Sequence, residues 1–244
     1  MKSEFVSTVS HELRTPLTAI AGSLGLINGG ALGEVPAAIQ QMLQIAQDNS
    51  GRLNLLINDL LDMDKLVAGK MLFALHDEAL QPLLEQAIEE NQPYASRYQV
   101  QLKLQGPATD ARVRVDKLRL AQVLANLLSN AAKFSPRGQS VEVRVQQHDA
   151  GVRISVTDHG PGVPENFQAR IFSKFSQADA TDTRQKGGTG LGLAISKEII
   201  ERMGGQIGFD STVGKGATFW LELTNLAAKA QPELPQQPED NRHA

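Results

Sequence analysis

The chain has 244 residues, of which 41% are hydrophobic and 21% charged, and its formal net charge is −3. This composition supports packed cores in about two domains and excludes a wholly disordered chain. The absence of cysteine excludes disulfides and thiolate metal sites, and the mixed charges give no sign of a nucleic-acid-binding surface. No apolar run approaches the roughly 20 residues that span a bilayer, and no signal peptide opens the chain, so we expect a cytoplasmic location.

The first predicted helix runs from about Phe5 to Asn28, where Gly29 and Gly30 supply a stop. His11 lies off its apolar seam and should face water on the flank of a helical bundle. Pro16 inside the helix removes a backbone hydrogen bond and costs about 3 kcal/mol, so this segment has a purpose beyond packing. The seam consists of apolar residues spaced by three or four: Val6, Val9, Leu13, Leu17, Ile20, Leu24 and Ile27. Because the helical pattern begins so early, we expect a sensor module, and any membrane anchor, upstream of Met1.

A second long helix is predicted from Pro36 to Val67 with the same alternation of steps. Two helices of about 25 to 30 residues that bury one stripe each form a poor isolated hairpin. Two such hairpins cover each other's stripes in a four-helix bundle, so we predict a homodimer through residues 1–67. Asn49 interrupts the stripe, and it either fixes the register of the bundle or occupies a solvated edge.

The period changes after residue 70. Alternating apolar residues predict strands over 99–104, 112–115, 140–145, 152–156, 206–209 and 217–223, with a weaker candidate over 71–75. Helical patterns lie between them over 79–94, 117–134 and 191–203, and the step at 149–151 predicts a β-hairpin. We therefore expect residues 70–225 to form an α/β two-layer sandwich with a mixed sheet. Residues 226–244 contain few large apolar residues, and we expect them to be disordered.

Three polar residues share one face of the helix predicted over 117–134. Asn126 and Asn130 are four positions apart, and Lys133 follows three later. Carboxamide oxygens are hard ligands suited to Mg²⁺, and the lysine offers a positive charge to phosphates. Taken alone, the same pattern also fits an ordinary polar helix face.

The strand predicted over 152–156 leads into Thr157-Asp158-His159-Gly160-Pro161-Gly162. Asp158 has the parity of the buried Val156, so its carboxylate should point inward, where an unpaired charge is costly. A ligand amine would satisfy it, and adenine carries one where guanine carries a carbonyl oxygen, which favours ATP over GTP. Gly160 and Gly162 allow the backbone to approach a ligand closely.

A glycine-rich run, Gly187-Gly188-Thr189-Gly190-Leu191-Gly192-Leu193, leads directly into the helix over 191–203. Backbone amides and the positive dipole end at such a helix start are suited to phosphate. No strand immediately precedes the run and no Walker lysine follows it, which argues against a dinucleotide fingerprint and a P-loop.

Together these stretches resemble sensor histidine kinases of two-component systems. His11-Glu12-Leu13-Arg14-Thr15-Pro16-Leu17 is similar to the phosphoacceptor box of that family. The later stretches resemble the N, G1 and G2 boxes of its Bergerat-type ATP-binding domain, with an F box over 171–177 and an ATP lid over 176–187. All five boxes occur in the family's order, and the resemblance extends from Phe5 to about Leu223.

The resemblance implies ATP and Mg²⁺ as cofactors. Asn130 would bind Mg²⁺ with help from Asn126, Lys133 would contact phosphate, and Asp158 would read adenine. Phe134 would cover the nucleotide, and Gly160 and Gly162 would shape its pocket. Three lid glycines would let the lid close over the phosphates: Gly188, Gly190 and Gly192. Thr189 and Leu191 complete the implied ATP site.

The implied reaction is autophosphorylation of His11 from ATP, followed by transfer to an aspartate on the receiver domain of a response regulator. An imidazole with an ordinary pKa of about 6.5 is mostly neutral at neutral pH, as a nucleophile must be, and Glu12 is the candidate base. The two domains join near Ala68 and Gly69, so the ATP domain must swing to reach His11 of its own chain or of its partner.

Three alternatives remain at this point. Thr15 resembles the family position that orients water to dephosphorylate the regulator, so the chain could act partly or mainly as a phosphatase. A non-catalytic module could dimerise with another kinase and hold ATP as a structural ligand. Another ATPase of the same fold is the third alternative, although the His11 box and the absence of large coupled domains argue against it.

Overall fold

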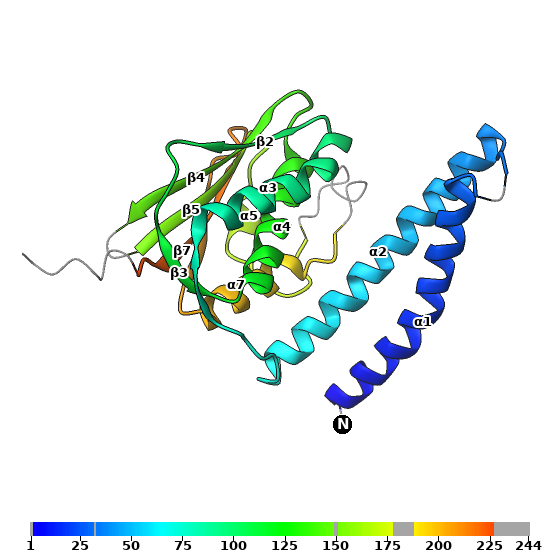
Figure 1. Cartoon of the computed structure of the whole chain (residues 1–244), viewed down its shortest axis with the longest axis horizontal. Helices are drawn as coiled ribbons and strands as arrows, with labels where there is room; N and C mark the ends of the chain where they lie inside the picture. The colour runs from blue at the N-terminus through cyan, green and yellow to red at the C-terminus, as the bar shows by residue number, and fades with distance from the viewer. Residues whose placement is uncertain (1, 32, 149–150, 178–187, 227–244) are drawn as a thin grey trace, which may run out of the picture.

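The computed structural model describes residues 2–31, 33–148, 151–177 and 188–226, with side chains from Glu12 onward within these ranges. A helical hairpin of α1 (Lys2–Asn28) and α2 (Ala37–Val67) precedes an α/β domain (Figure 1). Helix α1 continues through Pro16 and ends at Asn28, next to the predicted glycine stop. The predicted helical hairpin is confirmed. Among the described residues, no helix combines the length and apolar character needed to cross a membrane.

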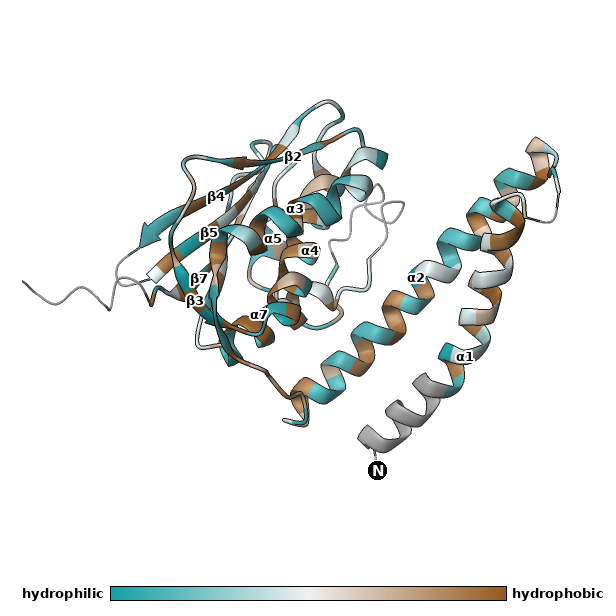
Figure 2. Cartoon of the chain, in the orientation of Figure 1, coloured by the Kyte–Doolittle hydropathy of each residue, from teal (hydrophilic) through white to brown (hydrophobic). Residues whose placement is uncertain are grey.

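The two hairpin helices pack through a small apolar cluster of Leu17, Ile57 and Leu61. Arg14 Nη2 adds a hydrogen bond of 3.0 Å to Asn58 Oδ1 across the pair. Much of the predicted apolar stripe nevertheless stays exposed in the single chain, and Figure 2 shows it as brown segments along both helices. The exposed residues are Leu13 and Ile20 of the α1 seam, together with α2 residues that follow the same spacing of three or four: Ile39, Met42, Leu53, Leu60 and Val67.

The α/β domain is a two-layer structure (Figure 1). Its main sheet has the order β2 (Gln101–Gln105), β4 (Ser140–His148), β5 (Gly151–Asp158), β7 (Ala217–Thr224) and β6 (Gln206–Ser211). Strand β2 runs parallel to β4 and the other neighbours are antiparallel, so the predicted mixed sheet is confirmed. The larger helices α3 (Leu80–Arg97), α4 (Lys117–Phe134) and α7 (Gly192–Arg202) form the second layer.

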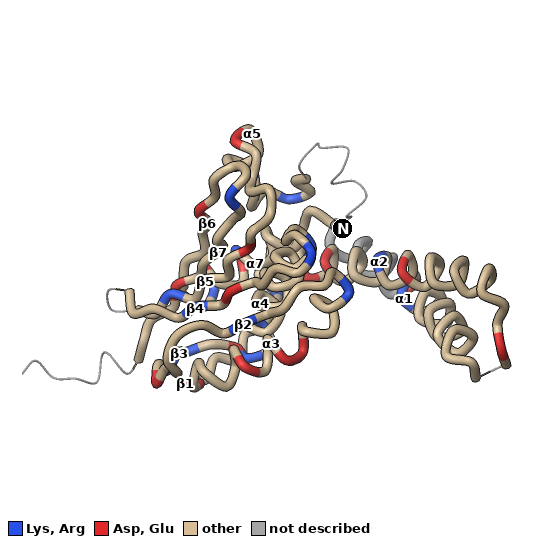
Figure 3. The backbone as a smooth tube through the Cα atoms, turned by 90° about the horizontal axis from the view of Figure 1, so that it is seen from above, with Lys and Arg blue, Asp and Glu red and all other residues tan. Residues whose placement is uncertain are grey.

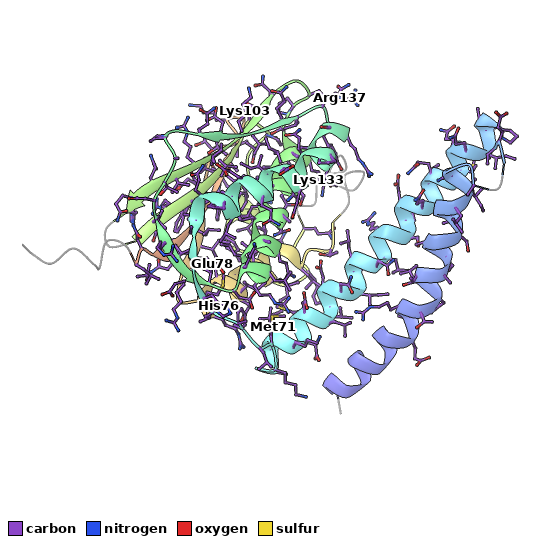
Figure 4. The ribbon with its side chains drawn as sticks, viewed as in Figure 1. Met71, His76, Glu78, Lys103, Lys133 and Arg137 are labelled. Atoms are coloured by element: carbon purple, nitrogen blue, oxygen red, sulfur yellow. The ribbon has the colours of Figure 1, made fainter. Side chains whose placement is uncertain are left out.

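The core lies between these layers. Residues of β5 alternate between buried and partly exposed positions, as a strand with one covered face requires. Helix α4 buries Leu120, Leu124, Leu127 and Leu128 against this face, at the spacing of an amphipathic helix. The hairpin also contributes to this core, through Met63 and Leu66 of α2, and Met71 follows at the junction labelled in Figure 4. The hairpin and the α/β domain thus share part of one core. The domain boundary predicted between residues 67 and 70 stays a prediction.

The structure corrects one strand prediction and adds a second, smaller sheet. Residues 71–75 form no strand, and β1 (His76–Ala79) begins after them. The reason is a side chain: Asp116 Oδ2 accepts from the backbone N–H of Ala74 at 2.9 Å, which takes that group away from any strand ladder. In addition, β3 (Arg112–Val115) pairs with β1 in a separate two-stranded sheet and does not belong to the main one.

Asp116 also begins α4, because its Oδ1 accepts from the backbone N–H of Arg119 at 3.1 Å. Burial by itself would raise the pKa of this carboxyl, but backbone N–H groups of Ala74, Arg119 and Leu118 outweigh it and hold the pKa below its ordinary value. One charged side chain thus fixes both the start of α4 and the path of the segment that follows α2.

Some predicted features lie outside the described residues. These are the turn over 149–150, residues 178–187 of the predicted ATP lid, and the tail over 227–244. The structure adds a single-turn helix, α5 (Glu165–Gln168), which the sequence pattern did not predict. In Figure 3 charged residues are sparse on the half of the hairpin farther from the α/β domain, whereas charges of both signs are spread over that domain.

Candidate functional site

A chain of hydrogen bonds connects α7 to the polar face of α4. Asn126 Nδ2 donates to Ser196 Oγ at 2.9 Å, and Asn130 Nδ2 donates to Asn126 Oδ1 at 3.3 Å. Ser196 is only 2% exposed, so the chain starts in the core and leads outward. Within the described part of the chain, the structure records no protein partner for the remaining amide oxygen, Oδ1 of Asn130.

Gly192 determines how closely α7 approaches α4. A Cβ atom at this position would lie 2.4 Å from Asn126 Oδ1, far inside the normal contact distance. Only glycine therefore permits the observed packing of these helices. Gly192 also begins α7, so the glycine-rich loop reaches the amide pair directly.

Asp158 lies at the end of β5 and is 5% exposed, in agreement with its position in the strand alternation. Its Oδ1 accepts from the backbone N–H of Gly160 at 2.8 Å. Burial raises the pKa of this carboxyl, although the N–H groups of Gly160 and Ala217 and the neighbouring His159 oppose the shift. The site thus contains a buried carboxylate that can accept a further hydrogen bond from a ligand.

Glycines allow the segments around Asp158 to come together. A Cβ at Gly160 would lie 2.7 Å from the carbonyl oxygen of Phe134, so this glycine lets the end of β5 meet the end of α4. Gly162 has a φ of +74°, and a Cβ there would lie 2.5 Å from the Thr212 carbonyl oxygen. Gly216, which no sequence motif singled out, makes a third close contact: a Cβ there would lie 2.1 Å from the carbonyl oxygen of Asp158.

Lys133 lies beside the glycine-rich loop. A Cβ on Gly188 would be 3.6 Å from Lys133 Nζ, and the same Nζ lies 4.9 Å from the centre of the Phe134 ring. Figure 4 shows Lys133 on the side of the α/β domain nearer the hairpin. Gly190 has a φ of +70°, and a Cβ there would lie 2.9 Å from the carbonyl carbon of Phe175, so the loop packs against the predicted F box. Leu191 is 1% exposed and anchors the loop in the core.

Thr189 bridges the loop to the hairpin. Its hydroxyl donates to Asp59 Oδ2 at 2.7 Å and accepts from the backbone N–H of Leu191 at 3.1 Å. Burial raises the pKa of Asp59, the Thr189 bond opposes this, and the negative charge of Asp62 adds to it. Three neighbouring residues of this segment therefore differ in what they contact. Gly192 lies close to the Asn126 amide, Thr189 bonds to Asp59, and Leu191 is buried in the core.

Further contacts hold α2 against the α/β domain. Asp62 Oδ2 accepts from Gln122 Nε2 at 2.8 Å and lies 3.6 Å from Arg119 Nη1. Arg202 of α7 donates to the carbonyl oxygen of Leu66. The polar contacts occupy one side of α2 between residues 59 and 66, the same stretch that enters the main core.

The proposed phosphoacceptor segment belongs to α1. His11 lies in this helix, but its side chain is outside the described residues. Glu12 and Thr15 are exposed. Pro16 has no N–H to offer the carbonyl group of Glu12, which consequently lacks its usual partner inside the helix. Of the described neighbours of His11, the polar residues Glu12 and Thr15 are thus accessible to solvent.

These residues fit a nucleotide with a divalent cation. The glycine-rich loop precedes the N-terminus of α7, Lys133 adds a positive charge, and Asn130 Oδ1 offers a hard oxygen ligand. Among the described residues, no cluster of three or more histidine, cysteine, aspartate or glutamate side chains could hold a metal ion. The Asn130 amide oxygen can serve as a metal donor on this face, and Asn126 orients that amide through its bond to Nδ2.

Comparison with known proteins identifies two family models along the chain. Residues 1–69 match the His Kinase A (phospho-acceptor) domain, and residues 115–226 match the Histidine kinase-, DNA gyrase B-, and HSP90-like ATPase. The chain is 39% identical over 236 residues to the circadian input-output histidine kinase CikA of Synechococcus elongatus, covering 95% of this chain and 31% of that protein.

Another curated relative is also a histidine kinase. The signal transduction histidine-protein kinase BarA of Escherichia coli K12 is 34% identical over 91% of this chain and 24% of its own length. The chain thus spans less than a third of these curated relatives. The crystal structure of full-length ShkA in complex with AMPPNP superposes with a TM-score of 0.72 at 32% identity, covering 91% of this chain and 46% of that one.

The helix contact at Gly192 leads to a testable prediction. Gly192→Ala should lower nucleotide affinity by about tenfold or more, because the added Cβ displaces the Asn126 amide that orients Asn130. Isothermal titration with a non-hydrolysable ATP analogue measures this effect. Gly51→Ala is the matched control, since nothing lies within 4 Å of a Cβ there. Equal affinities of the two variants would contradict the prediction.

Proposed function

This chain belongs to the sensor histidine kinases of two-component systems, and on that premise we propose that it is an ATP-dependent protein-histidine kinase. It autophosphorylates His11 and passes the phosphoryl group to an aspartate on the receiver domain of a response regulator. The observation that carries this proposal is the ordered amide pair, Asn126 and Asn130, beside Lys133 and the glycine-rich loop. The buried Asp158 supplies a recognition group for adenine in the same domain.

The residues take distinct roles in holding ATP and Mg²⁺. Asp158 would accept a hydrogen bond from the adenine amine, Lys133 would bind phosphate oxygens, and Asn130 Oδ1 would hold the cation. Bound Mg²⁺ supplies positive charge that offsets the negative charge on the transferring group. Leu191 holds the loop in place from the core, and the glycines keep its backbone close to the phosphates.

His11 acts as the nucleophile in its neutral form. One ring nitrogen forms a bond to the γ-phosphorus, the bond from that phosphorus to the bridging oxygen breaks, and ADP leaves. Glu12 takes the proton from the other ring nitrogen. Thr15 lies one helical turn after His11 and is exposed. In this proposal it positions water for dephosphorylation of the regulator. A cytoplasmic location of this chemistry is part of the same proposal.

The hairpin dimerises in this proposal. Leu53, Leu60 and Val67 of α2 recur at steps of seven, as do Leu13 and Ile20 of α1, and all five are exposed in the single chain. This heptad spacing is typical of helices that pack in bundles. A second copy of the hairpin would cover the stripe and complete a four-helix bundle.

Labelling with γ-labelled ATP and Mg²⁺ tests the activity itself. The unaltered chain should acquire acid-labile, base-stable label, whereas His11→Gln should acquire none because it lacks the accepting nitrogen. Asn130→Asp should reduce labelling strongly, since the change replaces the oriented amide. A chain that binds the nucleotide but never acquires label would overturn the kinase proposal in favour of a phosphatase or a binding module.

The contact between Thr189 and Asp59 gives a second prediction. The α/β domain must leave α2 to reach His11, so Asp59→Ala should increase the initial rate of autophosphorylation several-fold by removing a contact that holds the domain in place. The assay is the rate of label incorporation at saturating ATP. Asp48→Ala removes an exposed aspartate of α2 outside this contact region and serves as control. An unchanged rate in Asp59→Ala would show that this bond does not restrain the domain.

The dimer proposal predicts a change in mass. Leu53→Arg should shift the chain towards monomer in sedimentation equilibrium, because a charge would be buried in the proposed bundle. Leu118→Arg places the same change at an exposed leucine of α4, which is 72% exposed, and should leave the mass unchanged. Identical masses for the two variants and the unaltered chain would contradict the proposed interface.

A further inference from the structure

Ser196 is a buried polar residue that the proposed mechanism does not use. It lies on α7, one turn after Gly192, and is 2% exposed. Its Oγ accepts from Asn126 Nδ2 at 2.9 Å. A hydroxyl placed so deeply between two helices, and joined to the amide that precedes Asn130, suggests a task beyond packing.

The Asn126 amide has two different ends. Its nitrogen donates and its oxygen accepts, so a half-turn of the amide exchanges the two functions. In the observed orientation the nitrogen faces Ser196 and the oxygen accepts from Asn130 Nδ2. Asn130 therefore turns its nitrogen towards Asn126 and presents its oxygen outward.

The opposite orientation would reverse the outward group. Asn126 would then turn its nitrogen to Asn130, which could meet it only with its own oxygen. Asn130 would present an NH₂ group outward, and such a group cannot ligate a cation. The rotation of one buried amide thus decides whether the site presents a metal ligand.

Two positions on α7 lie against the Asn126 amide in the observed orientation. A Cβ on Gly192 would lie 2.4 Å from Asn126 Oδ1 and 3.2 Å from its Nδ2, so the oxygen is the end nearer Gly192. Ser196, four residues later on the same face, accepts from the other end. A serine hydroxyl can also donate, so Ser196 does not choose between the two ends by itself; it gives Asn126 Nδ2 its partner in the observed orientation, and without it this nitrogen loses that hydrogen bond.

We propose that Ser196 is a positioning residue for the Mg²⁺ ligand: through Asn126 it holds the Asn130 amide with its oxygen outward. This inference rests on the proposed binding of Mg²⁺ and ATP, and it adds a residue that touches neither. Its removal should affect the share of nucleotide affinity that depends on Mg²⁺, and it should spare the share that depends on adenine recognition by Asp158.

The test compares nucleotide affinity with and without the cation. Titration of a non-hydrolysable ATP analogue into the full chain, in Mg²⁺ and in EDTA, gives a ratio of affinities. Ser196→Ala should reduce this ratio by about tenfold and change the affinity in EDTA little, because the adenine contacts remain. Partial unfolding would lower both affinities together and leave the ratio unchanged, so the ratio separates positioning from stability.

Ser129→Ala is the matched control. Ser129 Oγ donates to the backbone oxygen of Asn126 at 3.1 Å, so this variant also removes a serine hydroxyl bonded to Asn126 but leaves the amide untouched. Its ratio should equal that of the unaltered chain. Equal reductions in the ratio for Ser129→Ala and Ser196→Ala would overturn the proposal, as would an unchanged ratio in Ser196→Ala.

A second background sharpens the test. In Asn126→Asp, the carboxylate can only accept, so Asn130 must donate to it whatever occupies position 196. Adding Ser196→Ala to that variant should therefore leave the ratio unchanged. A further reduction there would overturn the positioning role. If the unaltered chain shows no response to Mg²⁺, the metal role in the proposed function fails, and this inference fails with it.

Discussion

The close contact between α4 and α7 is the constraint on which the site depends. Because Gly192 has no side chain, α7 approaches until Asn126 lies against its backbone and Ser196 reaches the amide. The same glycine begins the helix, so the glycine-rich loop and the amide pair share one anchor. A bulkier residue at position 192 would separate the loop from the amides, because closely packed protein interiors tolerate added volume poorly.

Helix α2 belongs to two packing units. Ile57 and Leu61 pack against α1, whereas Met63 and Leu66 enter the core of the α/β domain. The polar contacts of Asp59 and Asp62 can exchange with water at small net cost, but withdrawal of Leu66 would expose a fully buried side chain. Movement of the α/β domain should therefore break the polar contacts and keep the apolar anchor, with a pivot near the end of α2.

Periodicity and local chemistry predicted much of the fold. The helical hairpin, the helix over 117–134 and the mixed sheet were all predicted from apolar spacing, and Asp158 is buried as its strand parity requires. The strand predicted over 71–75 was wrong because Asp116, more than forty residues later, captures the backbone of Ala74. Alternation alone cannot reveal such a distant side-chain partner.

The sequence by itself determined which chemical groups the chain carries: an amide pair one helical turn apart, a lysine on the same face, an inward carboxylate and a glycine-rich helix start. These follow from spacing within single elements, which neighbouring residues largely control. Only the tertiary structure decided that Ser196 holds Asn126 and that Thr189 bonds to Asp59. Both contacts join elements far apart in the chain, and side-chain hydrogen bonds across packed helices depend on how closely the backbones approach.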